Sequence, residues 1–173
     1  IIREHFPISA ILGVLAVVFA AAGGILFGAL TAIYRNRLPD YIIMLLVILG
    51  ISVPSFVIAA LSQLTLVTLN SAVGATILPV AGWGTILHML VPALVLGLGT
   101  MAYLTRLMRS SMLEVVNSDF VRTAKAKGVP PARIFTKHQL RNAILPVITV
   151  LGPSIAAITT GGFVVELVFA IPG

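Results

Sequence analysis

Long apolar runs alternate with short polar segments along this chain. Residues 8–33, 41–69, 86–104 and 144–165 contain no Asp, Glu, Lys or Arg. A helix that crosses a membrane needs about 20 consecutive, mostly apolar residues. The pattern therefore predicts four membrane-spanning helices at about these positions.

The first two predicted spans carry signals for packing and bending. Ala20, Gly24 and Gly28 recur at four-residue spacing on one face of the first span, which favours the close approach of another helix. Pro54 lies inside the second span and removes a backbone hydrogen bond there. We therefore expect a bend at Pro54, with a neighbouring serine helping to satisfy the freed carbonyl groups.

The longest polar segment, residues 106–143, separates the last two spans and holds eight of the eleven basic residues. Its pattern predicts two short helices divided by residues 128–131, because Gly128 permits a left-handed turn and the two prolines cannot continue a helix. The first of these helices is amphipathic. Its apolar stripe is Val115, Val116, Phe120, Val121 and Ala124, and its polar face is Asp119, Arg122, Lys125 and Lys127. Such a helix either lies on lipid headgroups or docks in a groove of a partner protein.

Composition and charge place the chain in a membrane and orient it. Hydrophobic residues make up 59% and charged residues 9%, whereas a soluble domain has about a quarter charged residues. The net charge of +6 is no nucleic-acid signal, because the basic residues flank apolar spans. All of them except Arg3 fall in the turn at 34–40 or in the long polar segment, so both are predicted to be cytoplasmic. Both ends of the chain are then external, and we expect a further helix upstream of this fragment.

The sequence offers little for covalent chemistry. It has no cysteine and no phosphate-binding G-x-x-x-x-G-K-[ST] loop, so we expect no catalytic residue, metal or cofactor. A secondary transporter or channel is the nearest rival reading, but it would need a coupling carboxylate within a span. Polar or bend-forming residues within the spans are candidates for a translocation path, although bonding to a neighbouring helix is the commoner use of such polar side chains. These candidates are Ser52, Pro54, Ser55, Gln63, Thr100, Thr159 and Thr160.

Several motifs together resemble those of dipeptide and oligopeptide ABC-importer permeases. The polar segment contains Asp119-Phe120-Val121-Arg122-Thr123-Ala124-Lys125-Ala126-Lys127-Gly128, then His138, Leu140-Arg141-Asn142-Ala143 and Leu145-Pro146-Val147. Outside it, the matching segments are Val53-Pro54-Ser55-Phe56, Leu78-Pro79-Val80-Ala81-Gly82-Trp83-Gly84, Val165-Glu166 and Pro172-Gly173. Importer permeases in general show E-A-A-x3-G-x9-I-x-L-P in this loop. Here Ala124 and Gly128 match, Arg122 and Thr123 replace the Glu and the first Ala, and Leu145-Pro146 comes five residues late.

This resemblance implies an all-α polytopic fold, the transmembrane domain of a type I ABC importer, with about four of six spans in residues 1–173. It also implies a non-catalytic permease subunit in a bacterial or archaeal cell membrane. The implied partners are a homologous second permease, two ATPase subunits that hydrolyse ATP, an extracytoplasmic solute-binding protein and the lipid bilayer, with no nucleic acid. Dipeptides or oligopeptides are the expected substrates, although the same type of importer also carries nickel chelates, glutathione or sugars.

The resemblance further implies which residues couple the permease to its ATPase. The helix around Phe120 is expected to insert into a groove on the ATPase and to bury Phe120 and Val121 there. Gly128 is expected to turn the following helix back towards the membrane. The expected coupling residues are Asp119, Phe120, Val121, Arg122, Ala124, Lys125 and Gly128.

Overall fold

The computed structural model describes residues 2–173, and the side chains of residues 5–158 and 162–173. All regular elements within residues 2–173 are helices, with no β-strand, which confirms the predicted all-α fold. The elements are α1 (Ile2–Ile33), α2 (Leu38–Ser52), α3 (Ser55–Val73), α4 (Ile86–Val116), α5 (Asp119–Ala126), α6 (Pro131–Arg133), the π-helix η1 (Ile134–Leu140), α7 (Arg141–Ala143), α8 (Leu145–Gly161) and α9 (Phe163–Val168).

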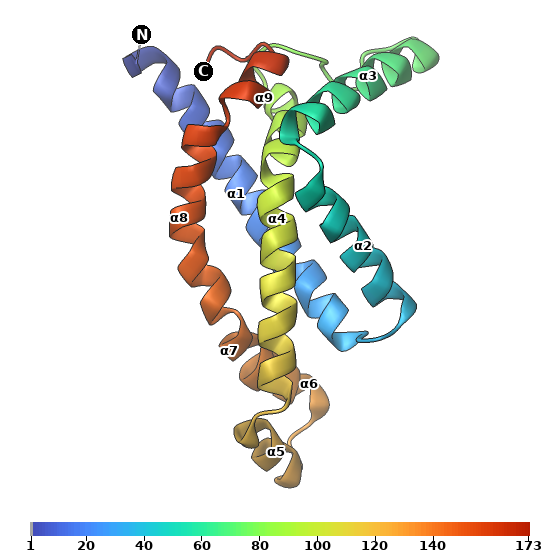
Figure 1. Cartoon of the computed structure of the whole chain (residues 1–173), viewed down its shortest axis with the longest axis vertical. Coiled ribbons are helices and arrows are strands. Elements are labelled where there is room, and N and C mark those ends of the chain that lie inside the picture. Colours follow the sequence, from blue (N-terminus) through green and yellow to red (C-terminus); the bar gives the residue numbers. More distant parts are fainter. Residues whose placement is uncertain (1) are drawn as a thin grey trace.

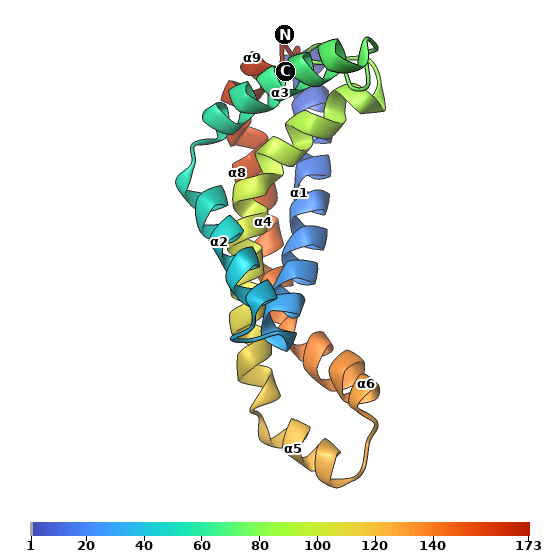
Figure 2. The same cartoon turned by 90° about the vertical axis from the view of Figure 1, so that its right-hand side faces the viewer.

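The long helices form an elongated bundle around α4. Helices α1 and α8 run beside α4 along the long axis, and α2 lies along another side of it (Figures 1 and 2). Helix α3 extends across the end that also holds both chain termini and α9, while α5 and α6 lie at the opposite end. The turn at 34–40 and the segment 106–143 therefore face one end, as the charge pattern predicts.

Small residues let α1 and α4 pack closely, as the spacing of Ala20, Gly24 and Gly28 predicts. All three are buried. A Cβ atom on Gly24 would lie 2.5 Å from the Cβ of Leu104, and one on Gly28 would lie 2.7 Å from the carbonyl oxygen of Thr105. A side chain at either position would therefore push the two helices apart.

We expect Gly28→Ala to destabilise the bundle by about 1–3 kcal/mol, the usual cost of overpacking a tight interface. The added methyl group meets the backbone of α4, which cannot move without displacing the helix. Gly152→Ala in α8 is a matched control, because a Cβ there meets no atom within 4 Å. Thermal unfolding of the detergent-solubilised protein measures both variants. Equal stability of the Gly28 and Gly152 variants would contradict the close contact.

Apolar length supports three to four membrane crossings. Helices α1, α3 and α4 are each long and apolar enough to span a bilayer, and the segments Pro131–Ala143 and Leu145–Ile158 make a fourth candidate if they are taken together across their 41° bend. The predicted range 86–104 covers only part of α4, whose last turns continue into the polar segment up to Val116. The other predicted ranges remain predictions of where the chain crosses the membrane.

The predicted second span is two helices rather than one bent helix. Helix α2 ends at Ser52, Val53 is extended (φ −88°, ψ 125°), and Pro54 precedes α3. Because proline has no N–H group, it cannot donate to the carbonyl group of Gly50. The chain then changes direction, and α3 leans away from α4 while α2 stays beside it (Figure 1). The bend expected at Pro54 is thus a complete break.

Candidate functional site: the coupling loop and the helix break

The loop between α4 and α8 owes its shape to a few residues with specific backbone roles. Asn117 ends α4, and its side-chain amide donates to the carbonyl oxygen of Leu113 (2.9 Å). Ser118 precedes α5 with an extended backbone. Gly128 has a φ of +72°, the left-handed conformation that commonly follows a helix and that glycine adopts most readily. Pro131 then starts the next helical segment, as proline often does at a first helical position. Short helices are therefore present on both sides of Gly128, as predicted. The prediction that Val115 and Val116 belong to the first of them is wrong, because α4 continues to Val116 and α5 begins at Asp119.

One face of α5 packs against the loop itself. Val121 is fully buried, and it forms a small core with Ala124 and Ile134, which are also buried. Val115 and Val129 cover this core from the two flanking segments. Ile134 is the first residue of η1, which leads back to the membrane bundle. This core therefore holds α5 against the returning segment of the loop.

The other face of α5 is open to solvent and mixed in character. Phe120 is 45% exposed and lies among charged residues. Asp119 and Arg122 flank it and lie 3.4 Å apart, with side chains that are 95% and 72% exposed. Exposed pairs of this kind contribute little to stability. Asp119 in the first turn and Lys125 in the last turn match the helix dipole.

The segment that returns to the membrane bundle contains a π-helix, which the sequence pattern does not predict. Residues Ile134–Leu140 adopt this rare conformation, which often occurs at functional positions. Asn142 in α7 donates its side-chain amide back to the carbonyl oxygen of His138 in η1 (2.6 Å). Leu145 then begins α8, and Pro146 occupies its first turn.

The break between α2 and α3 brings together three of the predicted path residues. Pro54 and Ser55 at the break and Thr100 on α4 line a cavity of about 360 Å³. Gly50 and Gly99 also line it, so backbone atoms contribute to its surface. Neither the hydroxyl group of Ser55 nor that of Thr100 has a hydrogen-bond partner among the described residues.

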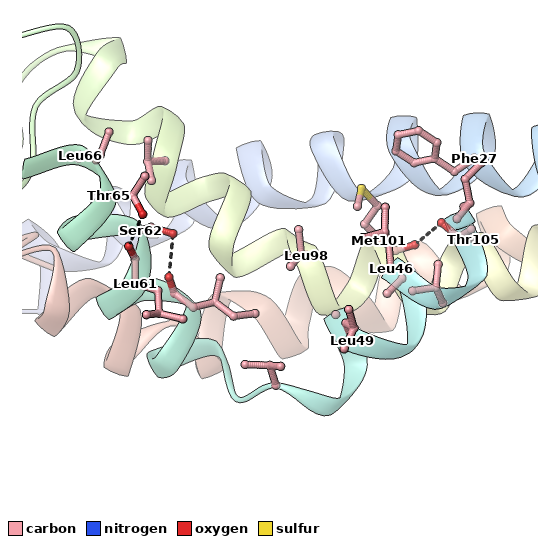
Figure 3. Close-up of a pocket in the computed structure, with 17 residues that line it drawn as sticks. Phe27, Leu46, Leu49, Leu61, Ser62, Thr65, Leu66, Leu98, Met101 and Thr105 are labelled. Carbon is pink, nitrogen blue, oxygen red and sulfur yellow. Dashed lines mark hydrogen bonds between the residues drawn. The ribbon is translucent and has the colours of Figure 1, made fainter. Parts of the chain in front are cut away.

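A larger cavity of about 750 Å³ lies between α2, α3 and α4, and it is apolar (Figure 3). Its three hydroxyl groups donate to carbonyl groups of their own helices. These bonds run from Ser62 to Ile58 (2.7 Å), from Thr65 to Leu61 (2.8 Å) and from Thr105 to Met101 (2.8 Å). With these groups satisfied, the lining presents mainly hydrocarbon, which suits contact with lipid or another helix more than contact with a polar solute.

Known proteins are similar to this chain over nearly its whole length. Residues 24–173 match the family described as the binding-protein-dependent transport system inner membrane component. The chain belongs to this family. It is 47% identical over 172 residues to the dipeptide transport system permease protein DppB of Bacillus subtilis, covering 99% of this chain and 54% of that protein. It is 44% identical over 175 residues to the oligopeptide transport system permease protein OppB of Haemophilus influenzae, covering 100% of this chain and 56% of that protein. The chain thus spans about half the length of these relatives.

In this inner membrane component, the predicted coupling residues separate into two groups. Val121 and Ala124 face the core of the loop, whereas the other five are exposed, namely Asp119, Phe120, Arg122, Lys125 and Gly128. The expectation that Phe120 and Val121 would both be buried by a partner is therefore wrong for Val121, because its own loop already covers it. The exposed group remains a predicted docking surface.

Gln63 has a structural use that the sequence did not indicate. Its side-chain amide donates to the carbonyl oxygens of Val168 (2.8 Å) and Val80 (3.3 Å), and so ties α3 to α9 and to the loop 74–85. Both amide hydrogens are committed within the chain, so only the carbonyl oxygen of Gln63 is left to contact a solute. The path candidates Thr159 and Thr160 lie outside the described side chains.

Asp40 and Arg109 form a site that the sequence analysis missed. Nε of Arg109 donates to one carboxylate oxygen of Asp40 (2.9 Å) and Nη2 donates to the other (2.8 Å). The backbone N–H of Asn36 also donates to Asp40 (2.9 Å). Asp40 precedes the apolar run that begins at Tyr41, and the hydrogen bonds from Arg109 lower the pKa of its carboxyl group. The carboxylate is therefore ionised at neutral pH.

Proposed function

We propose that this chain forms the membrane-embedded part of a permease subunit in an ATP-driven importer of short peptides. Separate ATPase subunits hydrolyse the ATP, a homologous second permease completes the pathway, and an extracytoplasmic binding protein delivers the solute. The names of the relatives favour dipeptides and oligopeptides over nickel chelates, glutathione or sugars. The permease itself carries no catalytic step.

The observation that carries this proposal is the division of α5 into an inner and an outer face. Its inner face is fixed to the loop through Val121 and Ile134. The outer face presents Phe120 on a rigid support at the far end of the bundle (Figure 2). A partly exposed aromatic side chain surrounded by charged residues is the usual composition of an interface anchor with a polar rim. We therefore assign this face to the groove of an ATPase subunit.

The translocation path is assigned to the side of α4 that faces the helix break. A peptide carries one backbone N–H donor and one C=O acceptor per residue, whatever its side chains. The hydroxyl groups of Ser55 and Thr100 offer both donors and acceptors, and the carbonyl group of Gly50 lacks its helical donor at Pro54. Such groups contact a peptide backbone without selecting side chains, so selectivity resides in the binding protein. Ser52 lies next to the break but does not line the cavity.

We expect Phe120→Ala to weaken retention of the ATPase by about tenfold. Truncating a well-packed interface anchor costs about 2 kcal/mol or more, and ~1.4 kcal/mol corresponds to a tenfold change in affinity. Asp119→Ala, at the rim, has a smaller effect because exposed charges contribute little. The measurement is ATPase recovered with the tagged full-length permease from membranes at matched expression.

Thr136→Ala is the control, because this residue is exposed on η1 in the same loop and its hydroxyl bonds only to the carbonyl group of Ala132. It is expected to retain the ATPase like the parent. Unchanged retention by Phe120→Ala would sink the docking assignment and place α5 on the lipid headgroups.

A further inference from the structure

The ion pair between Asp40 and Arg109 is buried at Asp40 and fully hydrogen-bonded there. Asp40 is 2% exposed, and three N–H donors surround its carboxylate. The Arg109 side chain is 25% exposed, so it reaches the pair from the edge of the bundle. Asn36 holds one of the donors and has a φ of +61°, a left-handed conformation that asparagine tolerates. The turn at 34–40 is thus shaped to present its backbone N–H to Asp40.

The pair joins two parts of the chain that are 69 residues apart. Within the side chains described, it is the only ion pair between two helices, since the other pair lies inside α5. A buried ion pair adds little net stability compared with a well-packed apolar pair, because both charges lose their hydration. Its established use is to fix one arrangement of the elements it joins. The pair therefore sets how α2 sits against α4.

Each joined element continues to a place where movement matters. Seven residues after Arg109, α4 ends at Val116 and passes through two residues to α5. Helix α2 runs from Asp40 to the break at Val53 and Pro54, where no helical hydrogen bond crosses Pro54. Between these points an apolar cavity is lined by residues of α2, α3 and α4 (Figure 3). Helix α2 is thus held at one end by the ion pair and is hinged at the other.

We propose that Asp40 and Arg109 are positioning residues that couple movement of the loop 106–143 to α2. When the ATPase pulls on α5, α4 carries Arg109 with it, and the ion pair moves the start of α2. The break at Val53 and Pro54 lets α2 turn relative to α3, which changes the cavity lined by Pro54, Ser55 and Thr100. This inference rests on the proposed function, because it needs an ATPase docked on α5.

The test uses the complete importer, with the full-length permease, reconstituted in liposomes and purified through a tag on the ATPase. Only assembled complexes are then measured. Uptake of labelled dialanine and trialanine is recorded together with ATP hydrolysis, and their ratio is the readout. We expect Asp40→Asn to lower this ratio by about tenfold, since coupling between two sites of a protein is typically about 5–150-fold. Arg106→Gln, an exposed arginine one turn from Arg109, should leave the ratio unchanged.

A covalent replacement of the ion pair separates coupling from stability. Residues 1–173 have no cysteine, so in a complex whose other cysteines are replaced by serine the double variant Asp40→Cys/Arg109→Cys carries only the two introduced thiols. A short bis-methanethiosulfonate reagent, which forms a disulfide with each thiol and releases methanesulfinate, should bridge them and restore peptide uptake per ATP, and dithiothreitol should abolish it again. The proposal is overturned if Asp40→Asn has the parent's ratio of peptide uptake to ATP hydrolysis. It is also overturned if bridging the two cysteines does not change this ratio. Failure of the proposed function would appear separately, as a parent complex that takes up neither peptide.

Discussion

Arg109→Ala is expected to lower the free energy of unfolding of the solubilised permease by about 3 kcal/mol. The substitution leaves the Asp40 carboxylate buried without its cation, and breaking a buried pair in this way costs about 3–5 kcal/mol. We expect the lower end of that range because the Arg109 side chain is 25% exposed and water reaches one side of the pair. Thermal or denaturant unfolding in detergent, followed by helical circular dichroism, measures the change.

Two further variants make this result specific. Arg109→Lys keeps the positive charge but cannot make the two parallel hydrogen bonds, so its loss should be intermediate. Arg106→Ala removes an exposed arginine from the same helix and should stay within about 0.5 kcal/mol of the parent. If Arg109→Ala were as stable as Arg106→Ala, the pair would be too hydrated to hold α2.

Apolar length predicts the helices of this protein well but not where each begins and ends. The range 86–104 stops where charge appears, yet α4 continues to Val116, because residues beyond the apolar stretch still favour a helix. Charge thus marks the expected edge of the membrane and not the end of the helix.

At Pro54 the sequence predicts a helix that bends, whereas the structure has two helices. The missing N–H group of proline predicts that the helix is disrupted there, but the packing of α3 decides whether the result is a kink or a break.

The sequence predicts the general location of the candidate site, but some of the predicted details are wrong. An apolar stripe on α5 is visible from helical spacing, but Phe120 and Val121 are neighbours in it. Only the return of Ile134 reveals which of them the loop itself covers. Asp40 reads as an ordinary first-turn acid, because nothing in the sequence points to a partner on α4. Gln63 likewise depends on two distant carbonyl groups. Local pattern fixes the faces of helices, whereas contacts across long separations fix which side chains remain free.

Val121→Asp is expected to detach α5 from η1, so that the loop 106–143 opens while the membrane bundle stays folded. Val121 is fully buried against Ala124 and Ile134, with no cationic side chain in that small core. A carboxylate placed there loses its hydration without gaining a partner, which costs several kcal/mol. A core of three buried residues cannot offset this cost. We therefore expect trypsin to cleave the loop at Lys125 and Lys127 at least about tenfold faster, because cleavage follows the population of the open form.

Phe120→Asp is the matched variant, because it places the same charge on the exposed face of the same helix. The loop should then stay folded and be cleaved at the parent rate, while retention of the ATPase falls as in Phe120→Ala. Retention should fall in Val121→Asp as well, but through loss of the support and not of the anchor. Rapid cleavage together with lost retention therefore marks the support, and lost retention alone marks the anchor. Cleavage of Val121→Asp at the parent rate would show that α5 is held by contacts other than this core.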